Sequence, residues 1–292
     1  MDIHLFLLIF CGALILFATV QDLRTREVAN WLTFSLLAFV LAYRAFWASI
    51  SSNASFFLWG LAGCAAFVGL AYAFYYGRVF AGGDAKLLMG VGTALPYHDA
   101  LGLAFWGGGF IALLFLTGAV YSLIYSTGIA WKRRRIFKRY FLSGIRNRRM
   151  RFVFALSIFL SVVLLALTLS VRSPYSISFV SGFYGIVGIL FILALPFLYV
   201  YLQAVERIMA VRILPGDLSE GDWLAKDVLV NGQKIKANVH GLSAQEIRLL
   251  RRHGKEVIVK QGIPFVPAFL FAWIMVCAAA TVPPVLSNLL LF

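Results

Sequence analysis

Long apolar stretches separated by short polar segments run through most of this chain. A helix needs about 20 mostly apolar residues to cross the hydrocarbon core of a bilayer. Seven stretches are long and apolar enough to predict a spanning helix: residues 3–20, 30–49, 55–77, 101–129, 152–171, 178–203 and 263–291. A shorter apolar stretch at residues 84–97, counted with them, makes eight. The pattern therefore predicts an all-α polytopic membrane protein with about eight transmembrane helices.

The composition excludes other classes of protein. Of the 292 residues, 62% are hydrophobic and 13% are charged, whereas a soluble domain is about 45–50% apolar and about 25% charged. These values exclude a soluble globular enzyme, a disordered chain and a secreted disulfide scaffold. All three cysteines, Cys11, Cys64 and Cys277, lie in apolar stretches, which favours packing roles over a disulfide framework or a metal site. No metal and no cofactor are predicted.

The distribution of charge predicts the orientation in the membrane. The formal net charge is +14, and the basic residues gather in four segments, residues 21–29, 77–86, 131–151 and 204–262. One basic residue, Arg172, occurs in the intervening connections, which are residues 50–54, 98–100 and 172–177. With eight helices all four basic segments fall on one side, which the positive-inside rule identifies as the cytoplasm. Seven helices would break this alternation, so the charges favour a short helix that starts near Asp84.

The densest basic segment is residues 131–151, which contains ten Lys or Arg residues and no acid. Because this charge lies directly beside apolar spans, the pattern indicates a topology signal held near anionic lipid head groups. We therefore predict a basic cytoplasmic loop here. The lipid bilayer is its expected partner, and no nucleic acid is expected to bind.

The long polar stretch at residues 204–262 has the pattern of a small folded insert. Residues 228–236 read as a β-hairpin around the dipeptide Asn231-Gly232. Ser243 and Glu246 have the spacing of a helix capping box, and Gly254 is a suitable helix stop. A further strand is expected at 256–260. The stretch predicts a small α+β cytoplasmic insert.

Candidate chemistry is restricted to a few acids. The four histidines do not form the HExxH pattern of zinc proteases, and there is no serine nucleophile elbow and no phosphate-binding loop. Only Asp22, Glu27 and Asp84 lie where predicted spans meet the cytoplasmic interface. An ionisable group at membrane depth is costly, which makes it a candidate for function.

The predicted topology places Asp22 and Asp84 at the same depth on the same side. Two carboxylates brought together tend to share one proton. The ionised member can accept a proton from water and the protonated member can polarise a peptide carbonyl, which is what aspartyl peptide hydrolysis requires. Gly82 and Gly83, which lack a Cβ atom, would let an extended substrate backbone approach the acid.

Structural roles are open for the same residues. Asp84 is a suitable cap for the helix that follows it, and Asp22 could pair with Arg24 or Arg26 at the interface. Glu27 is interpreted as an interfacial residue. Lys86 lies off the helical face of Asp84, so it is interpreted as an anchor on the cytoplasmic side.

Two segments resemble the motifs of a known family. Residues 22–32, DLRTREVANWL, resemble the first motif of the type IV prepilin peptidases, in particular the archaeal prepilin and preflagellin peptidases. Residues 81–88, AGGDAKLL, resemble the GxGD motif of the same family, and residues 262–269 look like the start of the terminal helix of its longer archaeal members. Ala81 stands where the first motif glycine is expected, and Ala29 replaces a usual proline. Neither departure removes a carboxylate.

The resemblance implies a function. It implies a membrane aspartyl endopeptidase in which Asp22 and Asp84 are the catalytic pair and no metal is needed. Its substrates would be pilin-like or flagellin precursors, cut at the cytoplasmic face between a short basic leader and the apolar helix that follows. Bacterial members that also methylate the new N-terminus have a Cys-rich cytoplasmic loop, so no methyltransferase activity is expected here.

On this interpretation the chain has five parts. They are a membrane catalytic core at residues 1–130, the basic loop at 131–151, two further membrane helices at 152–203, the insert at 204–262 and a terminal membrane helix at 263–292. The sequence indicates no oligomeric state.

Two alternatives remain open at this point. One is an intramembrane aspartyl protease of the presenilin type, but Gln21 stands where that family has tyrosine, and the late segment 282–286 reads VPPVL where that family has Pro-Ala-Leu. The other is a transporter or channel, which should carry ionisable residues midway through its spans. Only Arg44 approaches such a position, and the sequence favours snorkelling of its side chain to the outer surface.

Overall fold

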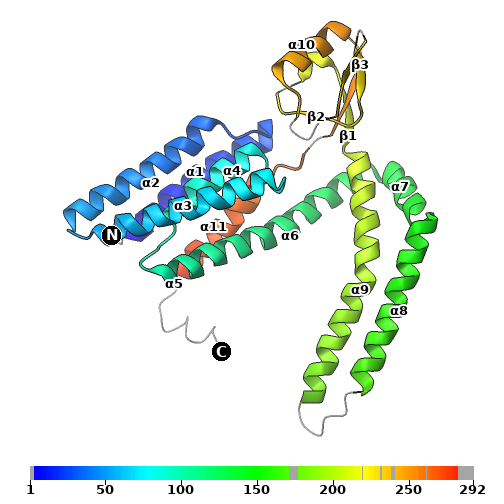
Figure 1. Cartoon of the computed structure of the whole chain (residues 1–292), viewed down its shortest axis with the longest axis horizontal. Coiled ribbons are helices and arrows are strands. Elements are labelled where there is room, and N and C mark those ends of the chain that lie inside the picture. The colour runs from blue at the N-terminus through cyan, green and yellow to red at the C-terminus, as the bar shows by residue number, and fades with distance from the viewer. Residues whose placement is uncertain are drawn as a thin grey trace. The chain divides into compact units, whose positions relative to one another are not determined.

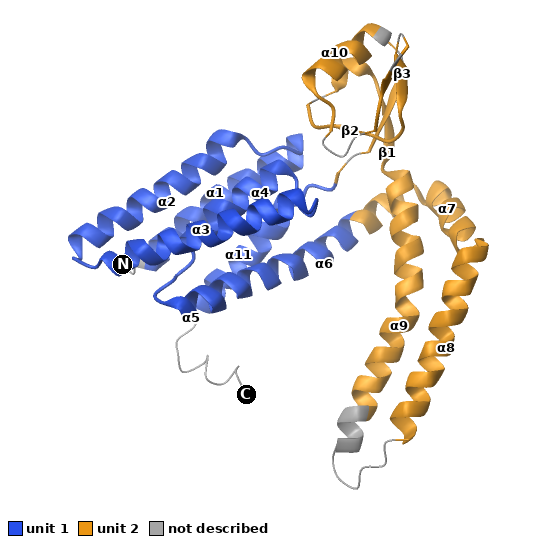
Figure 2. Ribbon diagram, in the orientation of Figure 1, with its two compact units in different colours: residues 1–125, 263–292 blue, residues 126–262 orange. Residues whose placement is uncertain are grey.

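The computed structural model describes residues 3–170, 177–218, 220–230, 232–237, 241–254, 256–260 and 262–281. The chain forms two compact units, one of residues 1–125 with 263–292 and the other of residues 126–262 (Figure 2). Within the described residues, six helices are long and apolar enough to cross a membrane. The helices Gly82–Ala94 and Val266–Thr281, of 13 and 16 residues, are shorter than this. The predicted multi-pass helical fold is therefore confirmed, with six helices of spanning length among the described residues where about eight were predicted.

All the regular elements in the described residues of the first unit are helices, joined by short connections (Figure 1). It contains α1 (Ile3–Thr25), α2 (Asn30–Ile50), α3 (Ala54–Tyr76), α4 (Gly82–Ala94), α5 (Ala100–Gly102), a π-helical turn (Leu103–Gly107), α6 (Gly108–Lys132) and α11 (Val266–Thr281). Helix α6 continues past residue 125 into the second unit. Helix α11, the last helix among the described residues, packs against α1, the first.

Helix α4 is the buried centre of this unit. It contacts α1, α2 and α3, and most of its residues from Ala85 onward are buried. Glycines permit this close packing: a Cβ atom at Gly92 would lie 1.9 Å from the ring of Phe67, and one at Gly90 would lie 2.9 Å from Leu36. Small residues at such crossings let membrane helices approach closely. The tight packing holds the start of α4, which carries Asp84, in one place.

Arg44 is fully buried, and the prediction that it snorkels to the outer surface is wrong. Its guanidinium donates hydrogen bonds to the carbonyl oxygens of Thr93, Leu95 and Phe56, at 3.1, 2.5 and 2.9 Å. The last carbonyls of a helix have no partners within the helix, so Arg44 satisfies those at the end of α4. This structural use removes the residue that suggested a transporter.

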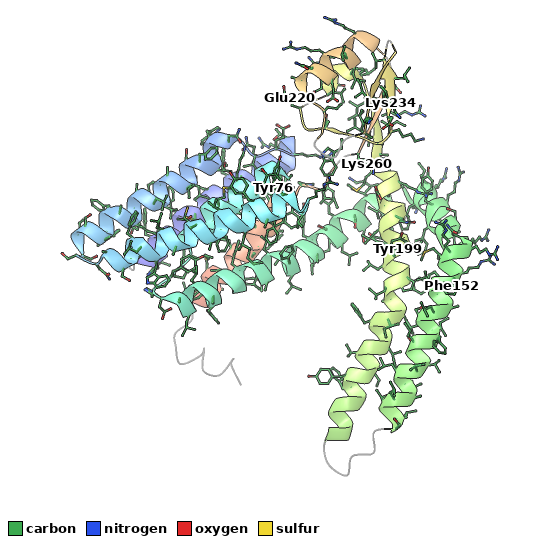
Figure 3. All side chains as sticks on the ribbon, in the orientation of Figure 1. Tyr76, Phe152, Tyr199, Glu220, Lys234 and Lys260 are labelled. Carbon is green, nitrogen blue, oxygen red and sulfur yellow. The ribbon has the colours of Figure 1, made fainter. Side chains whose placement is uncertain are left out.

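The second unit begins with three further helices. They are α7 (Arg134–Arg146), α8 (Arg148–Ser170) and α9 (Ile177–Ile208). Helices α8 and α9 pack against each other, and large apolar side chains such as Phe152 and Tyr199 point outward from the pair (Figure 3). This exposure is what lipid-facing surfaces require.

The basic segment at residues 131–151, predicted as a basic loop between spans, is mostly helical. Helix α7 packs on α9, where the rings of Phe137 and Tyr201 lie 5.7 Å apart and Gly144 fits against Val200. Its Lys and Arg side chains are exposed. The helix forms because apolar residues recur every three to four positions among the charges, which gives it one face that can pack.

The insert in the second unit is the predicted small α+β structure. Three strands form an antiparallel sheet in the spatial order β1 (Ala210–Ile213), β5 (Val257–Lys260) and β2 (Trp223–Leu224). A 3-10 turn (Pro215–Asp217) lies between β1 and β2 in the chain. Between β2 and β5 the chain forms the hairpin of β3 (Val228–Val230) and β4 (Gln233–Ile235) and then helix α10 (Ala244–His253). A separate hydrophobic core, which includes Leu250 and Val259, holds these elements together.

Local signals in the insert are confirmed. The Ser243 and Glu246 capping box is formed, and Gly254 ends α10 with a left-handed φ of +68°. Gly232 in the hairpin turn has a φ of +82°. Asn231 of the same turn lies outside the described residues, as do Arg172 and residues 282–286 elsewhere in the chain. Lys234 pairs with Asp227 at 2.9 Å, and this hydrogen bond holds the pKa of the exposed Asp227 carboxyl below its usual range.

Candidate active site

Asp22 lies in the last turn of α1 and is only 5% exposed. Its Oδ2 atom accepts a hydrogen bond from the backbone N–H of Val266 at 3.0 Å, and the Phe265 N–H also donates to the carboxyl. Val266 begins α11, and the first N–H groups of a helix have no partners within it. A carboxylate is favourable at this end of the helix dipole. Asp22 therefore joins the first helix of the chain to the last one described.

The alternative in which Asp22 forms an ion pair with Arg24 or Arg26 is not found among the described residues. The two ion pairs found among the described residues, Lys234–Asp227 and Lys260–Glu206, both lie in the second unit. Arg26 acts on Asp22 electrostatically, and its φ of +58° turns the chain out of α1. Glu27 is exposed, as an interfacial residue would be.

Asp84 occupies the third position of α4. The residue that caps this helix is Ala81, whose backbone N–H donates a hydrogen bond to the Asp84 carboxyl. The carboxyls of Asp84 and Asp22 interact electrostatically. The structure thus brings together, at one end of the first unit, the two acids that the sequence singled out.

Two side-chain hydrogen bonds hold the residues of the motifs in place, one between the two motifs and one at the first motif. The Lys86 Nζ atom donates to Asn30 Oδ1 at 2.7 Å, which links α4 to the start of α2. The Gln21 Oε1 atom accepts from the Ala29 N–H at 3.2 Å, which fixes the connection between α1 and α2. Lys86 thus has a defined partner in addition to its predicted place at the cytoplasmic side. Sequence reasoning missed this contact because the partners are 56 residues apart.

Gly82 and Gly83 begin α4 directly before Asp84. A Cβ atom at Gly83 would lie 3.6 Å from Val28, and one at Gly82 would lie 3.8 Å from Tyr75, which are ordinary van der Waals distances. The packing of the protein itself therefore does not require glycine at either position. This contrasts with Gly92 on the same helix, where Phe67 leaves no room.

Tyr121 on α6 is a polar residue of this region that sequence reasoning did not single out. Its hydroxyl is buried and has no hydrogen-bond partner among the described residues, and it interacts electrostatically with Asp22. The available signal was a tyrosine inside a predicted span, which is too common to be informative.

The described residues contain no group of three or more His, Cys, Asp or Glu side chains with the proximity of metal ligands. The three cysteines are free thiols, and Cys11 is buried. The titratable chemistry at the site thus comes from two carboxyls and a phenol.

Comparison with known proteins identifies the part of the chain that holds these groups. Residues 8–126 match the model of the type IV leader peptidase family, Peptidase A24. No curated protein and no solved structure shows a significant match. The matched region contains Asp22, Asp84 and Tyr121. Residues 8–126 are therefore similar to the aspartic proteases of the type IV leader peptidase family, and they lie within a multi-pass membrane protein.

Proposed function

We propose that this protease removes the short basic leader from pilin-like or flagellin precursors at the cytoplasmic face of the membrane, with Asp22 and Asp84 as its catalytic pair. The observation that carries the proposal is the electrostatic pairing of these two carboxyls inside the family-matched region. They stand 62 positions apart in the sequence, Asp22 in the last turn of α1 and Asp84 in the first turn of α4.

Two neighbouring carboxyls supply the chemistry of peptide hydrolysis. Like charges held together do not both ionise easily, so the pair tends to carry one proton between them. The ionised carboxylate takes a proton from the attacking water while the protonated one donates a hydrogen bond to the scissile carbonyl. When the C–N bond breaks, the proton taken from water passes from the pair to the leaving amine, and the water oxygen stays in the new carboxylic acid.

The cytoplasmic placement follows from the basic segments of the chain. Arg24 lies in the last turn of α1 and Lys86 near the start of α4, while Arg26 and Arg78 lie in the connections that follow α1 and α3. Such residues favour the inner side. A precursor with a basic leader also keeps that leader inside and inserts the apolar helix after it. Its scissile bond would then lie at the depth of Asp22 and Asp84.

The archaeal branch of the family fits the motifs best. The segment DLRTREVANWL at residues 22–32 and the start of the terminal helix at residues 262–269 both resemble archaeal prepilin and preflagellin peptidases. The start of α11 donates to Asp22, so in this chain the terminal helix would take part in forming the site.

Replacement of either acid by its amide tests the proposal. Asp22→Asn keeps an oxygen that can accept from the Val266 N–H, so we expect the helix contact to survive while hydrolysis is lost. For both Asp22→Asn and Asp84→Asn we expect leader cleavage to fall by at least about 10³-fold, as expected when a general acid or base is removed. The assay mixes purified protein with a pilin precursor and follows the shortened product.

Glu27→Gln is the matched control, because it removes the same charge from an exposed acid five residues from Asp22. We expect it to cleave at the rate of the unchanged protein. Undiminished cleavage by Asp22→Asn or by Asp84→Asn would refute the catalytic pair. A cut inside the precursor's apolar helix, away from the leader junction, would favour the presenilin-type activity instead.

A further inference from the structure

Helix α6 packs against the start of α11 through one face. The Thr117 hydroxyl is within hydrogen-bond distance of the Ala268 carbonyl, at 3.1 Å, so the two helices touch there. One residue further on, Gly118 lies against the ring of Phe265, which a Cβ atom at that position would approach to 2.5 Å. These contacts fix which side of α6 faces the residues that hold Asp22.

Tyr121 continues this face by one turn. It stands four residues after Thr117 and three after Gly118, and side chains at those spacings share one face of a helix. Phe265, which α6 approaches through Gly118, is one of the two residues whose N–H groups donate to Asp22, and Val266 is the other. The electrostatic interaction between Tyr121 and Asp22 agrees with this placement.

The Tyr121 hydroxyl is buried without a hydrogen-bond partner in the described residues. Burial of an unpaired hydroxyl is unfavourable, and nearly all buried polar groups in proteins are paired, so an exception calls for an explanation. A phenylalanine would fill the same space without this cost. An unpaired donor that interacts electrostatically with Asp22 is explained if its partner arrives with the substrate.

We propose that Tyr121 is a third catalytic group of this site, whose hydroxyl donates a hydrogen bond to the oxygen of the scissile carbonyl as that oxygen becomes an oxyanion. The proposal rests on the proposed function. When water attacks, a C–O bond forms, one water proton passes to the aspartate pair and the negative charge moves to the carbonyl oxygen. Collapse of this intermediate breaks the C–N bond, and the proton leaves with the amine. Tyr121 keeps its own proton throughout.

The test compares Tyr121→Phe with Tyr125→Phe. Both changes remove one hydroxyl from α6, one turn apart, and the two rings are neighbours at 5.9 Å. For Tyr121→Phe we expect kcat for precursor cleavage to fall by about 10²- to 10³-fold, the usual effect of removing one oxyanion donor, with KM nearly unchanged. Because the lost hydroxyl has no partner, the thermal unfolding midpoint should not fall. Tyr125→Phe should leave all three quantities unchanged.

Wild-type kcat in Tyr121→Phe would overturn the proposal. So would a lower unfolding midpoint together with a raised KM, because that combination indicates a packing role. Asp84→Asn, assayed in parallel, separates this result from the proposed function. If Asp84→Asn is inactive while Tyr121→Phe is fully active, only the role of Tyr121 fails; if Asp84→Asn still cleaves the precursor, the catalytic pair itself fails.

Discussion

At the scale of single residues, Asp22 has a structural contact as well as a proposed catalytic role. Its carboxyl accepts from the first N–H groups of α11, so the candidate site is built partly from backbone donors at the far end of the chain. Asp84 makes a similar contact with the Ala81 N–H at the start of its own helix. Each acid is thus oriented by a helix N-terminus, which limits the positions that its carboxyl can take.

Gly83 offers a separate residue-scale prediction. We propose that Gly82 and Gly83 contact the substrate backbone, because the protein's own packing leaves space there for a methyl group. We expect Gly83→Ala to fold normally and to raise KM for the precursor several-fold or more, since the added methyl group would occupy the path of the substrate backbone. Steady-state cleavage kinetics and the thermal unfolding midpoint measure the two effects.

Gly109→Ala is the control for this change, because its Cβ atom would meet nothing within 4 Å and it lies in α6, away from the motif. It should leave KM unchanged. If Gly83→Ala also cleaves with unchanged KM and kcat, the substrate does not approach this position, and the role of the two glycines is excluded.

At the scale of elements, α4 decides the position of Asp84. This helix is too short to cross a bilayer by itself, at 13 residues against about 20, and α1, α2 and α3 surround it. Its far end is held by Arg44, which bonds to the carbonyls of Thr93 and Leu95. A short helix anchored in this way can carry polar groups at membrane depth because its neighbours shield them from lipid.

The close fit of α4 against α3 predicts a strong effect of one methyl group. Gly92→Ala would place a Cβ atom 1.9 Å from Phe67, and such overpacking typically costs about 1–3 kcal/mol. We expect a lower thermal unfolding midpoint in detergent or in lipid nanodiscs, and reduced cleavage because α4 shifts under Asp84. Gly109→Ala, which removes a helix glycine in open space, should not lower the midpoint. An unchanged midpoint in Gly92→Ala would contradict the packing described for α4.

At the scale of the whole molecule, the chain combines a helical unit that holds the candidate site with a second unit that contains α7, the α8–α9 pair and a small α+β insert. Apart from the buried Arg44, the basic residues of the first unit lie in or next to the connections at one set of helix ends, and the second unit holds the others, where α7 exposes its charges. The other connections that the structure describes, such as residues 51–53, carry no basic residue. This asymmetry sets the expected orientation.

Cysteine labelling tests that orientation. Glu27 and Ser52 are both exposed and lie in connections at opposite ends of α2. In intact cells we expect a membrane-impermeant thiol reagent to label Ser52→Cys, and in inverted vesicles to label Glu27→Cys. The unsubstituted protein, with Cys11, Cys64 and Cys277 in its helices, gives the background. Labelling of Glu27→Cys from outside intact cells would place the candidate site on the other side of the membrane.

Much of this fold was predictable from the sequence because its signals are local. Hydropathy identifies the long helices, and turn and cap residues identify the hairpin with Gly232 and the capped helix that begins after Ser243. The two acids could be named as candidates because few ionisable residues occur at membrane depth. The helical form of α7 was also in the sequence, in the spacing of Phe137, Phe141 and Gly144, but its charges suggested a loop.

Only the tertiary structure decided which of these groups meet. The hydrogen bond from Val266 to Asp22 spans 244 positions, and those from Arg44 to the end of α4 span 49 and 51. The buried hydroxyl of Tyr121 becomes informative only when its surroundings are known. Periodicity and capping are properties of neighbouring residues, whereas these contacts depend on how α1, α4, α6 and α11 pack, and no single segment encodes that arrangement.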